Sequence, residues 1–318
     1  MRIQRSVPGA AASPVALTIG NFDGVHLGHQ AMLARLRVAA AERGLAPWVM
    51  TFEPHPREFF APDQAPARLT SLREKLDLLA AHGMQGAQVC RFDYALAQTA
   101  PEDFIARILV RGLAARWILV GDDFRFGARR AGDFALLKRE AARYGYDVEA
   151  MSSVLNAGER VSSTAVRTAL AAGRLERAAQ LLGRPYSISG RVVHGDGVGR
   201  KLGFPTANVQ MKHNRPPLCG IFAVELAGAG SAPRRGVASL GVRPTVKTGG
   251  APCLEVHVFD CDEDLYGRHV RVDFLHKLRD EEKYVDLETL TRQIALDVQH
   301  THDYFRRRDA AALRHAHS

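Results

Sequence analysis

The sequence predicts an α/β domain with a parallel sheet, followed by a small antiparallel β-barrel and a C-terminal helix. Three observations support this fold class. The chain has 318 residues, which is long for a single hydrophobic core. Up to about residue 183, short apolar runs alternate with helical patterns, as they do where helices connect parallel strands. Beyond it, short alternating runs separated by glycine turns predict a barrel. We therefore predict domains of residues 1–183 and 184–318, with the boundary at Gly183-Arg184-Pro185.

The composition is that of a soluble globular protein, with 46% hydrophobic and 24% charged residues. No apolar run reaches the roughly 20 residues that a membrane span needs. Met1–Pro14 lacks the apolar core of a secretory signal, so we expect a cytoplasmic protein. Cys90, Cys219, Cys253 and Cys261 have no spacing typical of a zinc site or a redox motif, so we expect buried, reduced thiols.

The formal net charge of +9 suits a polyanionic partner, and it suits small phosphorylated substrates equally well. The basic residues are spread along the chain, and the one tight run, Arg306–Arg308, closes a predicted helix, where cations are favourable anyway. A barrel that binds RNA without catalysis is the alternative, but no aromatic-rich basic strand is present to stack bases. We therefore do not expect nucleic acid as a partner.

The first predicted strand, Val15–Ile19, leads through the turn of GNFDGVHLGHQ into a helix. His26 and His29 lie one helical turn apart, so their rings share a face beside the unpaired amides of the helix start. This arrangement predicts a phosphate site. The alternatives are capping or surface histidines and a metal pair, but metalloprotease spacing needs i, i+4 and a glutamate between. The preceding turn supplies further candidate phosphate contacts: Gly20, Asn21, Phe22, Asp23 and Gly24.

A second strand, predicted at Trp48–Phe52, ends in Glu53-Pro54-His55-Pro56. Because two prolines oppose both strand and helix, we place His55, Phe59 and Phe60 on a loop at the carboxyl end of this strand. The alternation then continues with helices near 71–82, from 101 and over 133–144, and with strands near 87–92, 117–120 and 147–151.

Two more polar segments follow this pattern. GDDFRFGARRAGD at 121–133 follows a strand, and ligands of parallel sheets bind beyond the carboxyl ends of strands. Asp123 and Phe124 are therefore candidate nucleotide contacts. Ser163 and Thr164 open a helix that carries Arg167. Such hydroxyls are first of all caps, but with the arginine they also form a phosphate cradle.

The second half contains five clear strand patterns and one predicted helix. The strands are expected at 186–193, 221–226, 235–240, 254–259 and 270–274, the helix at about 286–307, and a frayed tail at 313–318.

The glycine-rich segment RVVHGDGVGRKLGFPTAN at 191–208 is not a P-loop. Arg200 stands where the second glycine is required, and Leu202 replaces the Ser or Thr that should follow Lys201. Its three glycines, Gly195, Gly197 and Gly199, fit either a flexible hairpin turn or a loop over a nucleotide.

Three oxygen-bearing side chains in the second half have the chemistry of a phosphoryl-transfer site. Thr206 and Asn208 alternate along an extended segment and so point the same way, and their oxygens suit Mg²⁺. Glu255 stands inside an apolar strand. It is either a residue of the exposed face or a general base, and the pattern alone leaves both open.

Together these segments resemble the bacterial bifunctional riboflavin kinases/FMN adenylyltransferases, the prokaryotic FAD synthetases, over almost the whole chain. The first half is similar to the histidine-glycine-histidine nucleotidylyltransferases in GNFDGVHLGH, TFEPHP, GDDFRFGARRAGD and VSSTAVR. The second half is similar to riboflavin kinase in GRKLGFPTAN, GVRPT, LEVHVFD, DLYG and LRDEEKY. Ile221-Phe222 replaces the usual valine-tyrosine, and Val246-Lys247-Thr248 is less typical.

For the barrel, the resemblance implies phosphorylation of riboflavin by ATP with Mg²⁺, which yields FMN and ADP. Glu255 would take the proton from the riboflavin 5′-hydroxyl, and Thr206 and Asn208 would bind the metal. The loop of Gly195, Gly197, Gly199 and Lys201 would lie over the nucleotide. Arg279 and Glu281 are candidate flavin contacts.

For the α/β domain, which is expected to be Rossmann-like, the resemblance implies adenylylation of FMN. The FMN phosphate would attack the ATP α-phosphate, and FAD and pyrophosphate would result. His26, His29 and Arg167 would stabilise the developing charge, while His55, Phe59 and Phe60 are candidate flavin contacts.

Overall fold

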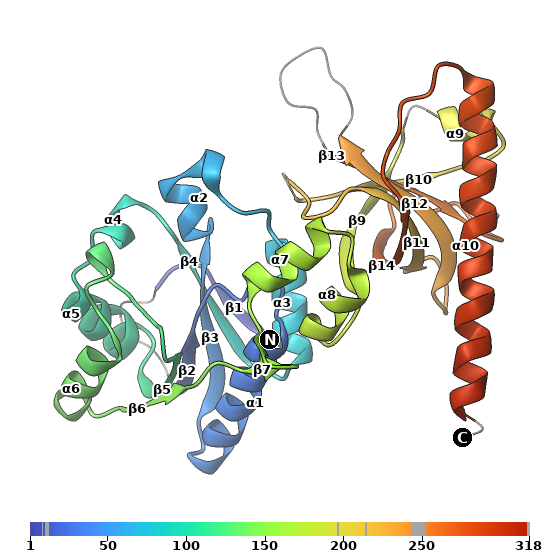
Figure 1. The fold of residues 1–318 in the computed structure, drawn as a ribbon. Helices are drawn as coiled ribbons and strands as arrows, with labels where there is room; N and C mark the ends of the chain where they lie inside the picture. The colour runs from blue at the N-terminus through green and yellow to red at the C-terminus, as the bar shows by residue number, and fades with distance from the viewer. Residues whose placement is uncertain (8, 10–12, 196, 214, 243–251, 317–318) are drawn as a thin grey trace. The chain divides into compact units, whose positions relative to one another are not determined.

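In the computed structural model, the chain is described over residues 1–7, 9, 13–195, 197–213, 215–242 and 252–316. These residues form two compact units. The first unit comprises residues 1–66 and 72–163, and the second comprises residues 67–71 and 164–318. The two units are described separately below (Figure 1).

The first unit is built on a six-stranded sheet whose neighbouring strands all run parallel. The strand order is β1-β4-β3-β2-β5-β6. The strands span Arg2–Gln4 (β1), Val15–Ile19 (β2), Ala46–Glu53 (β3), Gly86–Arg91 (β4), Ala115–Gly121 (β5) and Asp147–Met151 (β6). All five residues of β2 are buried, which is typical of a strand covered on both faces.

Helices cover both faces of this sheet (Figure 1). Helices α1 (Leu27–Glu42) and α3 (Leu72–Ala81) contribute Leu33, Leu36 and Leu79 to one apolar cluster. The π-helix η2 (Phe104–Gly112) and α6 (Phe134–Tyr144) contribute to the cluster on the other face. Shorter elements complete the unit: α2 (Pro56–Phe60), η1 (Pro62–Gln64), α4 (Tyr94–Ala97), α5 (Pro101–Asp103), η3 (Ala128–Arg130) and the hairpin β7 (Leu155–Asn156) with β8 (Glu159–Arg160).

The strand order reverses at β2, because β3 and β4 follow on one side of it and β5 and β6 on the other. At such a switch point the loops after two neighbouring strands diverge and leave a crevice for a ligand. Here those loops are residues 20–26, after β2, and residues 122–133, after β5. The topology therefore directs two of the predicted phosphate and nucleotide segments to one edge of the sheet.

The second unit is a closed antiparallel barrel in the order β10-β13-β12-β11-β14-β9. Its strands span Tyr186–Val193 (β9), Ala207–Gln210 (β10), Gly220–Ala227 (β11), Arg234–Val242 (β12), Pro252–Val258 (β13) and His269–Arg279 (β14). Alternate residues of β9 and β13 point inward, as in Tyr186, Ile188, Leu254 and Val256. Closure leaves the barrel without an unpaired strand edge.

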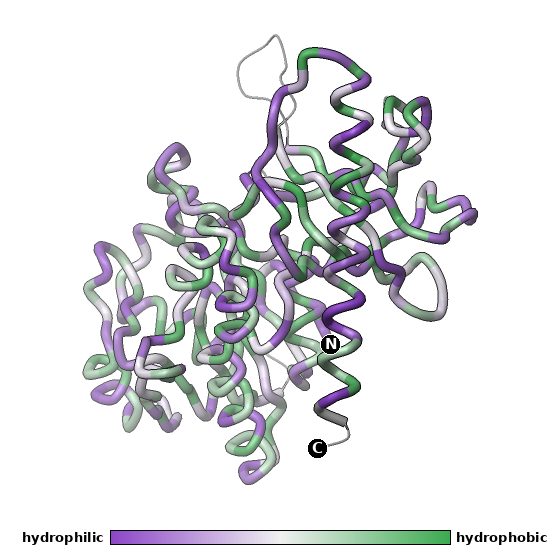
Figure 2. The backbone as a smooth tube through the Cα atoms, turned by 45° about the vertical axis from the view of Figure 1, so that its right-hand side comes forward, coloured by the Kyte–Doolittle hydropathy of each residue, from purple (hydrophilic) through white to green (hydrophobic). Residues whose placement is uncertain are grey.

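Helices flank the barrel. Helix α7 (Ser163–Ala171) begins at the last residue of the first unit, and α8 (Leu175–Leu182) and α9 (Val198–Lys201) follow. Helix α10 (Leu287–Ala316) contacts β11, β12 and β14, and its C-terminal part continues past the strands (Figure 1). Polar and apolar segments alternate along α10 in Figure 2, in keeping with a helix that packs by one face only.

The fold class predicted from the sequence is confirmed, but three local predictions were wrong. Residues 56–60 form a helix and not a loop, because Pro56 occupies the first helical position, where its missing N–H costs nothing. Residues 313–316 continue α10 and are not a frayed tail, while 317–318 lie outside the described residues. Residues 198–201 of the glycine-rich segment also form a helical turn. The predicted boundary at residue 183 stays a prediction, because the compact units divide earlier, after Ser163.

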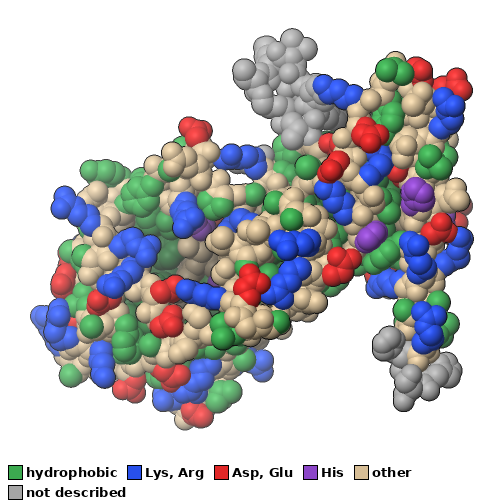
Figure 3. Space-filling model, viewed as in Figure 1, with side chains coloured by type: hydrophobic (Ala, Val, Ile, Leu, Met, Phe, Trp, Pro, Cys, Tyr) green, Lys and Arg blue, Asp and Glu red, His purple; other side chains and the backbone are tan. Residues whose placement is uncertain are grey.

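None of the helices in the described ranges is both long and apolar enough to cross a membrane. All four cysteines lie in the described part of the chain, and none forms a disulfide; Cys90 is buried, whereas Cys219 is exposed. On the face shown in Figure 3, lysine and arginine side chains alternate with aspartate and glutamate. That face offers no continuous basic surface of the kind that nucleic acid needs.

Candidate active sites

The loop after β2 has an unusual backbone that brings its polar groups inward. Phe22 and Val25 adopt positive φ of 49° and 41°, and both are fully buried. Such conformations are strained for side-chain-bearing residues and persist where packing enforces them. The carbonyl of Asn21 accepts a hydrogen bond from the Thr51 hydroxyl at 3.2 Å, which ties this loop to β3. Asp23 is buried in the same loop.

His26 and His29 meet as the sequence predicts. His26 caps α1, its Nδ1 accepting from the amide of His29 at 3.4 Å. The two rings stack with their centroids 3.7 Å apart and their planes 18° from parallel. A side chain at Gly28 would come within 3.2 Å of the His26 ring, so glycine leaves this stack undisturbed. The capping role of His26 is confirmed, whereas its role in a phosphate site stays a prediction.

Electrostatics keep His29 neutral. Burial, the neighbouring His26 and the charge of Lys75 together hold the pKa of His29 well below its ordinary value near 6.5. Lys75 on α3 is only 4% exposed, which is rare for a lysine. Lys75 therefore adds positive charge near His29. Sequence reasoning missed Lys75, because one lysine in an amphipathic helix gives no signal.

Two buried polar atoms in this pocket have no hydrogen-bond partner among the described residues. They are Oδ1 of Asn21 and Nδ1 of His29. Buried polar groups are nearly always satisfied, so atoms of this kind mark a place where a ligand completes the hydrogen bonds. Both belong to the predicted phosphate site.

The three residues of the predicted phosphate cradle, Ser163, Thr164 and Arg167, fall into different units. Ser163 donates from its hydroxyl to the backbone carbonyl of Asp23 at 2.9 Å and so braces the histidine loop within the first unit. Thr164 and Arg167 belong to the second unit. There Nε of Arg167 donates to the carbonyl of Ala67 at 2.6 Å. The share of Thr164 and Arg167 in a phosphate cradle stays a prediction.

The loop after β5 holds the predicted nucleotide contacts in fixed positions. Asp123 is exposed and forms an ion pair of 2.6 Å with Arg160 from the β7–β8 hairpin. Phe124 stacks on Phe126 with centroids 5.5 Å apart, beside the core of the first unit. Asp123 therefore faces solvent, where a ligand can reach it.

Four phenylalanines cluster around α2. The rings of Phe59 and Phe60 each lie edge-on to Phe92, at 5.5 and 5.6 Å, and Phe52 completes the group. Phe60 is 66% exposed. His55 caps α2 by accepting from the amide of Arg57 at 3.1 Å, in a capping box with Glu58. An exposed aromatic surface of this kind suits a planar ligand.

In the second unit, the register of the barrel brings together two of the three predicted phosphoryl-transfer residues. Asn208 on β10 lies directly opposite Glu255 on β13, and Ser239 flanks Glu255 on the other side. Sγ of Cys253 lies 3.5 Å from Oε1 of Glu255 and 4.0 Å from Oδ1 of Asn208. Glu255 is therefore a member of a polar cluster. The apolar sequence of its strand alone did not show whether it lies in such a cluster or on a plain exposed face.

A cavity of about 560 Å³ opens over Glu255. Thr206 and Glu255 line it together with aliphatic and aromatic side chains, among them Leu202, Phe204, Ile221, Val237, Leu290 and Ile294. Arg279 and Glu281, the predicted flavin contacts, lie in its wall. Both are already engaged: Arg279 forms a two-fold ion pair with Asp297 of α10, and Glu281 accepts from the hydroxyl of Ser239 at 3.0 Å.

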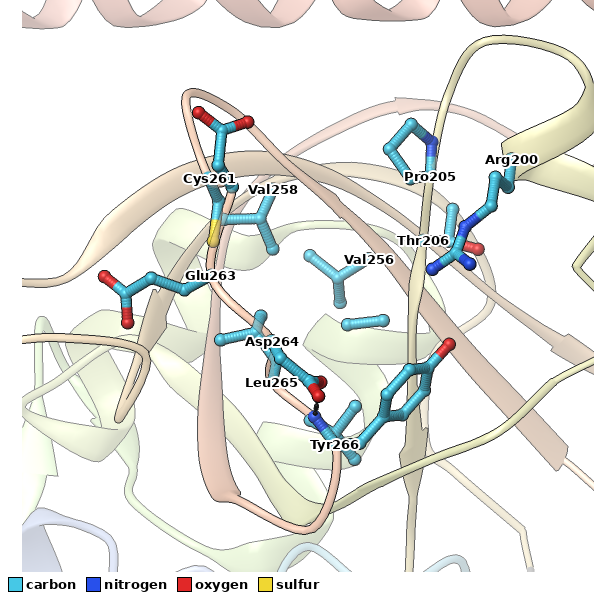
Figure 4. A pocket seen from close by; sticks show the side chains of 13 residues that line it. Arg200, Pro205, Thr206, Val256, Val258, Cys261, Glu263, Asp264, Leu265 and Tyr266 are labelled. Carbon is cyan, nitrogen blue, oxygen red and sulfur yellow. Dashed lines mark hydrogen bonds between the residues drawn. The ribbon is translucent and has the colours of Figure 1, made fainter.

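A smaller cavity, of about 430 Å³, lies on the other side of Thr206, which lines both. In Figure 4, the side chain of Arg200, from α9, and that of Tyr266, from the loop before β14, point into it. Asp264 accepts from the amide of Tyr266 at 2.9 Å and so fixes that loop. The ring of Tyr266 packs against that of His194 at 3.8 Å. Arg200, the aromatic ring and the apolar floor suit the base and phosphates of a nucleotide, while the carboxylates of Asp262, Glu263 and Asp264 line the rest of the cavity.

Each of the three glycines in residues 195–199 is required for a different structural reason. A Cβ on Gly195 would lie 2.3 Å from the Asn208 amide nitrogen, and one on Gly199 would lie 2.5 Å from the carbonyl of Phe204. Gly197 has a φ of 69°, which glycine adopts freely. Lys201 ends α9 and is exposed. The glycine pattern thus reflects close packing around Thr206 and Asn208 as well as a turn.

The donor set in the barrel fits a divalent metal that is shared with a nucleotide. The side-chain oxygens of Thr206 and Asn208 are neutral, and Mg²⁺ accepts such oxygens as ligands. Over the described residues, no three of His, Cys, Asp and Glu lie close enough together to hold a metal ion by themselves. Nucleotide phosphates and water would therefore complete the coordination. Of the segments singled out from the sequence, residues 243–245 of GVRPT and residues 246–248 lie outside the described residues.

Comparison with known proteins gives the same two-part division. Residues 9–165 match the family model of FAD synthetase, and residues 182–305 match that of riboflavin kinase. The bifunctional riboflavin kinase/FMN adenylyltransferase of Escherichia coli K12 is 47% identical over 308 residues, covering 96% of this chain and 98% of the relative. That of Haemophilus influenzae is 43% identical over 290 residues, covering 91% and 94%.

A solved structure also shares the fold. The crystal structure of a protein described as a macrolide-efflux protein from Streptococcus pneumoniae aligns with a TM-score of 0.81 and 28% identity, covering 95% of this chain and 99% of that one. The name macrolide-efflux protein is the description of that protein and not of this chain. The structural similarity covers both units.

Proposed function

The chain belongs to the family of bifunctional riboflavin kinases/FMN adenylyltransferases, and on this basis we propose which residues carry out each of its two reactions. The two activities use ATP, and enzymes that transfer phosphoryl or nucleotidyl groups from ATP need a divalent metal. We propose Mg²⁺ for this role, bound by Thr206 and Asn208 in the barrel. The cytoplasmic location stays a prediction.

The observation that carries the kinase assignment is the position of Thr206 between two cavities. We assign riboflavin to the larger cavity, because its apolar walls suit the flavin ring system, and ATP to the smaller one beside Arg200 and Tyr266. The γ-phosphate then meets the riboflavin hydroxyl near Thr206. Mg²⁺ bound there would neutralise charge on the phosphates. Glu255 accepts the proton of the hydroxyl as its oxygen attacks the γ-phosphorus, the bond from that phosphorus to the bridging oxygen of the β-phosphate breaks, and ADP leaves.

The observation that supports the adenylyltransferase assignment is the stacked histidine pair with its unpartnered polar atoms at the switch point of the sheet. We assign the triphosphate of ATP to this site, with Asn21, Asp23 and the helix start around it. The FMN phosphate attacks the α-phosphate, the bond to the β-phosphate breaks, and pyrophosphate leaves. His26 and His29 stabilise charge that develops on the phosphoryl oxygens.

The flavin of the second reaction has its best candidate surface at Phe59 and Phe60, which lie in the first unit beside His55. Arg279 and Glu281 are assigned to the flavin of the first reaction. Their contacts with Asp297 and Ser239 support a role in shaping the cavity wall.

The direct test is to incubate the protein with riboflavin, ATP and Mg²⁺ and to separate the flavins. We expect FMN to form first and FAD to follow. Formation of neither flavin would refute the proposal. Formation of FMN alone would refute the adenylyltransferase assignment, and FAD made only from added FMN would refute the kinase assignment.

A further inference from the structure

Strand β13 carries a second polar residue on the same face as Glu255. Residues two apart on a strand point to the same side, so His257 stands beside Glu255, and both line the larger cavity. The Nδ1 atom of His257 lies 2.8 Å from the backbone carbonyl oxygen of Pro205. None of the reactions assigned above uses this histidine.

This hydrogen bond has only one possible direction. A carbonyl oxygen can only accept, so Nδ1 of His257 carries the proton and donates it. Pro205 immediately precedes Thr206, the proposed metal ligand that lines both cavities. The bond therefore connects the strand that carries the general base to the segment that carries the metal ligand.

The segment from Phe204 to Thr206 also packs closely against the backbone of Gly199. The amide of Phe204 donates to the carbonyl of Gly199 at 2.8 Å, and a Cβ on Gly199 would lie 3.3 Å from the Thr206 hydroxyl. The ring of Phe204 packs edge-on against that of His257, with centroids 5.6 Å apart. His257 thus makes both a polar and an aromatic contact with the segment.

We propose that His257 is a positioning residue of the kinase reaction, which sets the distance between the metal ligand Thr206 and the base Glu255. The inference rests on the proposed function of the barrel. Its physical basis is that phosphoryl transfer depends on alignment more than on covalent chemistry by the protein, so a shift of a fraction of an ångström between base and phosphate is costly. Groups that orient metal ligands commonly matter nearly as much as the ligands themselves.

Two substitutions separate positioning from mere packing. His257→Phe keeps an aromatic ring against Phe204 and removes the donor. His257→Asn places an amide N–H near the position of Nδ1 and so retains the donor. His302→Phe is the matched control, because His302 stacks on Phe259 of the same strand region at 4.3 Å without a role in the proposed chemistry.

The assay has two readouts on the full-length protein. The first is kcat and KM for riboflavin phosphorylation, for which we expect His257→Phe to lower kcat about tenfold with little change in KM. The second, without turnover, is calorimetric binding of ADP with Mn²⁺ and of ADP with EDTA. We expect His257→Phe to weaken only the binding that includes the metal. His257→Asn should restore both properties, and His302→Phe should behave as the wild type.

Several results would overturn the inference. They are wild-type kcat and metal-dependent binding in His257→Phe, an equal defect in His257→Asn, or a change confined to the KM for riboflavin. FAD formation from added FMN serves as a folding control and should be unchanged in all variants. Failure of the proposed function is distinguishable, because the wild-type protein itself would then fail to phosphorylate riboflavin.

Discussion

The sites that we propose for ATP in the two units differ in the charged groups that surround them. In the first unit, the proposed anion site consists of a helix start, two stacked histidines and a buried lysine, with the buried Asp23 in the preceding loop. In the second unit, the proposed site has a carboxylate, Glu255, beside neutral oxygen ligands. The difference follows from the nucleophile that each reaction uses.

A phosphate group is already ionised near neutral pH, since its second pKa is about 6. The FMN phosphate therefore needs no base, and the first unit has only to bind and neutralise charge. The hydroxyl of riboflavin must lose a proton as it attacks, so the second unit needs a base. The contrast teaches that the chemical state of the attacking group, more than the leaving phosphate, decides which side chains a site requires.

The largest effect is expected from Glu255→Gln. The amide cannot accept the proton, so riboflavin phosphorylation should fall about 10³-fold, within the usual range for loss of a general base. Conversion of added FMN to FAD should be unchanged. Glu288→Gln, at an exposed position of α10, is the matched control. Both rates are followed by chromatography of the flavins. A loss of both activities in a folded protein would refute the separation of the sites.

His29→Ala should have the opposite effect on the two activities. Removing one donor to the reacting phosphate should lower FAD formation by about 10²-fold, while FMN still accumulates from riboflavin. His82→Ala, at the end of α3, controls for loss of an imidazole elsewhere in the first unit. If FAD continued to form at the wild-type rate, the phosphate would have to be bound elsewhere.

The third prediction concerns stability and compares the two units directly. Asp297 is 4% exposed in its side chain and pairs with Arg279 across 2.7 Å, joining α10 to β14. Asp297→Asn leaves the partly buried Arg279 guanidinium without its counterion, which should lower the free energy of unfolding of the second unit by up to about 3 kcal/mol. Asp303→Asn, from an exposed pair on the same helix, should cost less than about 1 kcal/mol.

The chain offers a simple way to resolve the two units in that measurement. Its two tryptophans, Trp48 and Trp117, both lie in the first unit. Tryptophan fluorescence therefore reports the unfolding of the first unit in urea, while far-ultraviolet circular dichroism reports both. Asp297→Asn should shift only the transition seen by dichroism. A shift of the fluorescence transition by the same amount would contradict independent stability of the two units.

Sequence periodicity predicted the repeating elements well and the irregular ones poorly. Strands such as Tyr186–Val193 and Val15–Ile19 have the predicted bounds, because burial on one or two faces leaves a clear pattern. Strand Arg2–Gln4 was missed, since a three-residue edge strand has no period to detect. The helix at Pro56–Phe60 was missed because proline opposes a helix only in its interior.

The site residues that the sequence predicted lie close together in the chain, whereas the residues that it missed are distant in sequence from their partners. His26 and His29 lie three residues apart, so the start of α1 alone brings them together. Lys75 reaches the same pocket through tertiary packing. Likewise, the contact between His257 and Pro205 depends on how β13 meets the segment before β10, and no local pattern contains that information.

The smallest predicted effect is a change in the pH dependence of stability in the first unit. The pKa of His29 is lowered on folding, so the unfolded state binds more protons below pH 6.5. Stability is therefore fully present above about pH 6.5 and falls as the pH drops towards the folded-state pKa, by at most about 1.4 kcal/mol per pH unit. Since Lys75 contributes to the lowering, Lys75→Met should raise this pKa and narrow the pH range of the loss.

The measurement is urea unfolding followed by tryptophan fluorescence between pH 5 and pH 8, compared with Lys138→Met, which removes an exposed charge from α6 of the same unit. Only the slope against pH is read, because removing a buried ammonium also changes stability at every pH. An unchanged or wider pH range in Lys75→Met would mean that burial and His26 alone keep His29 neutral. Lys75 would then have no part in the contrast with the barrel, which would rest on the helix start and the two histidines of the proposed anion site.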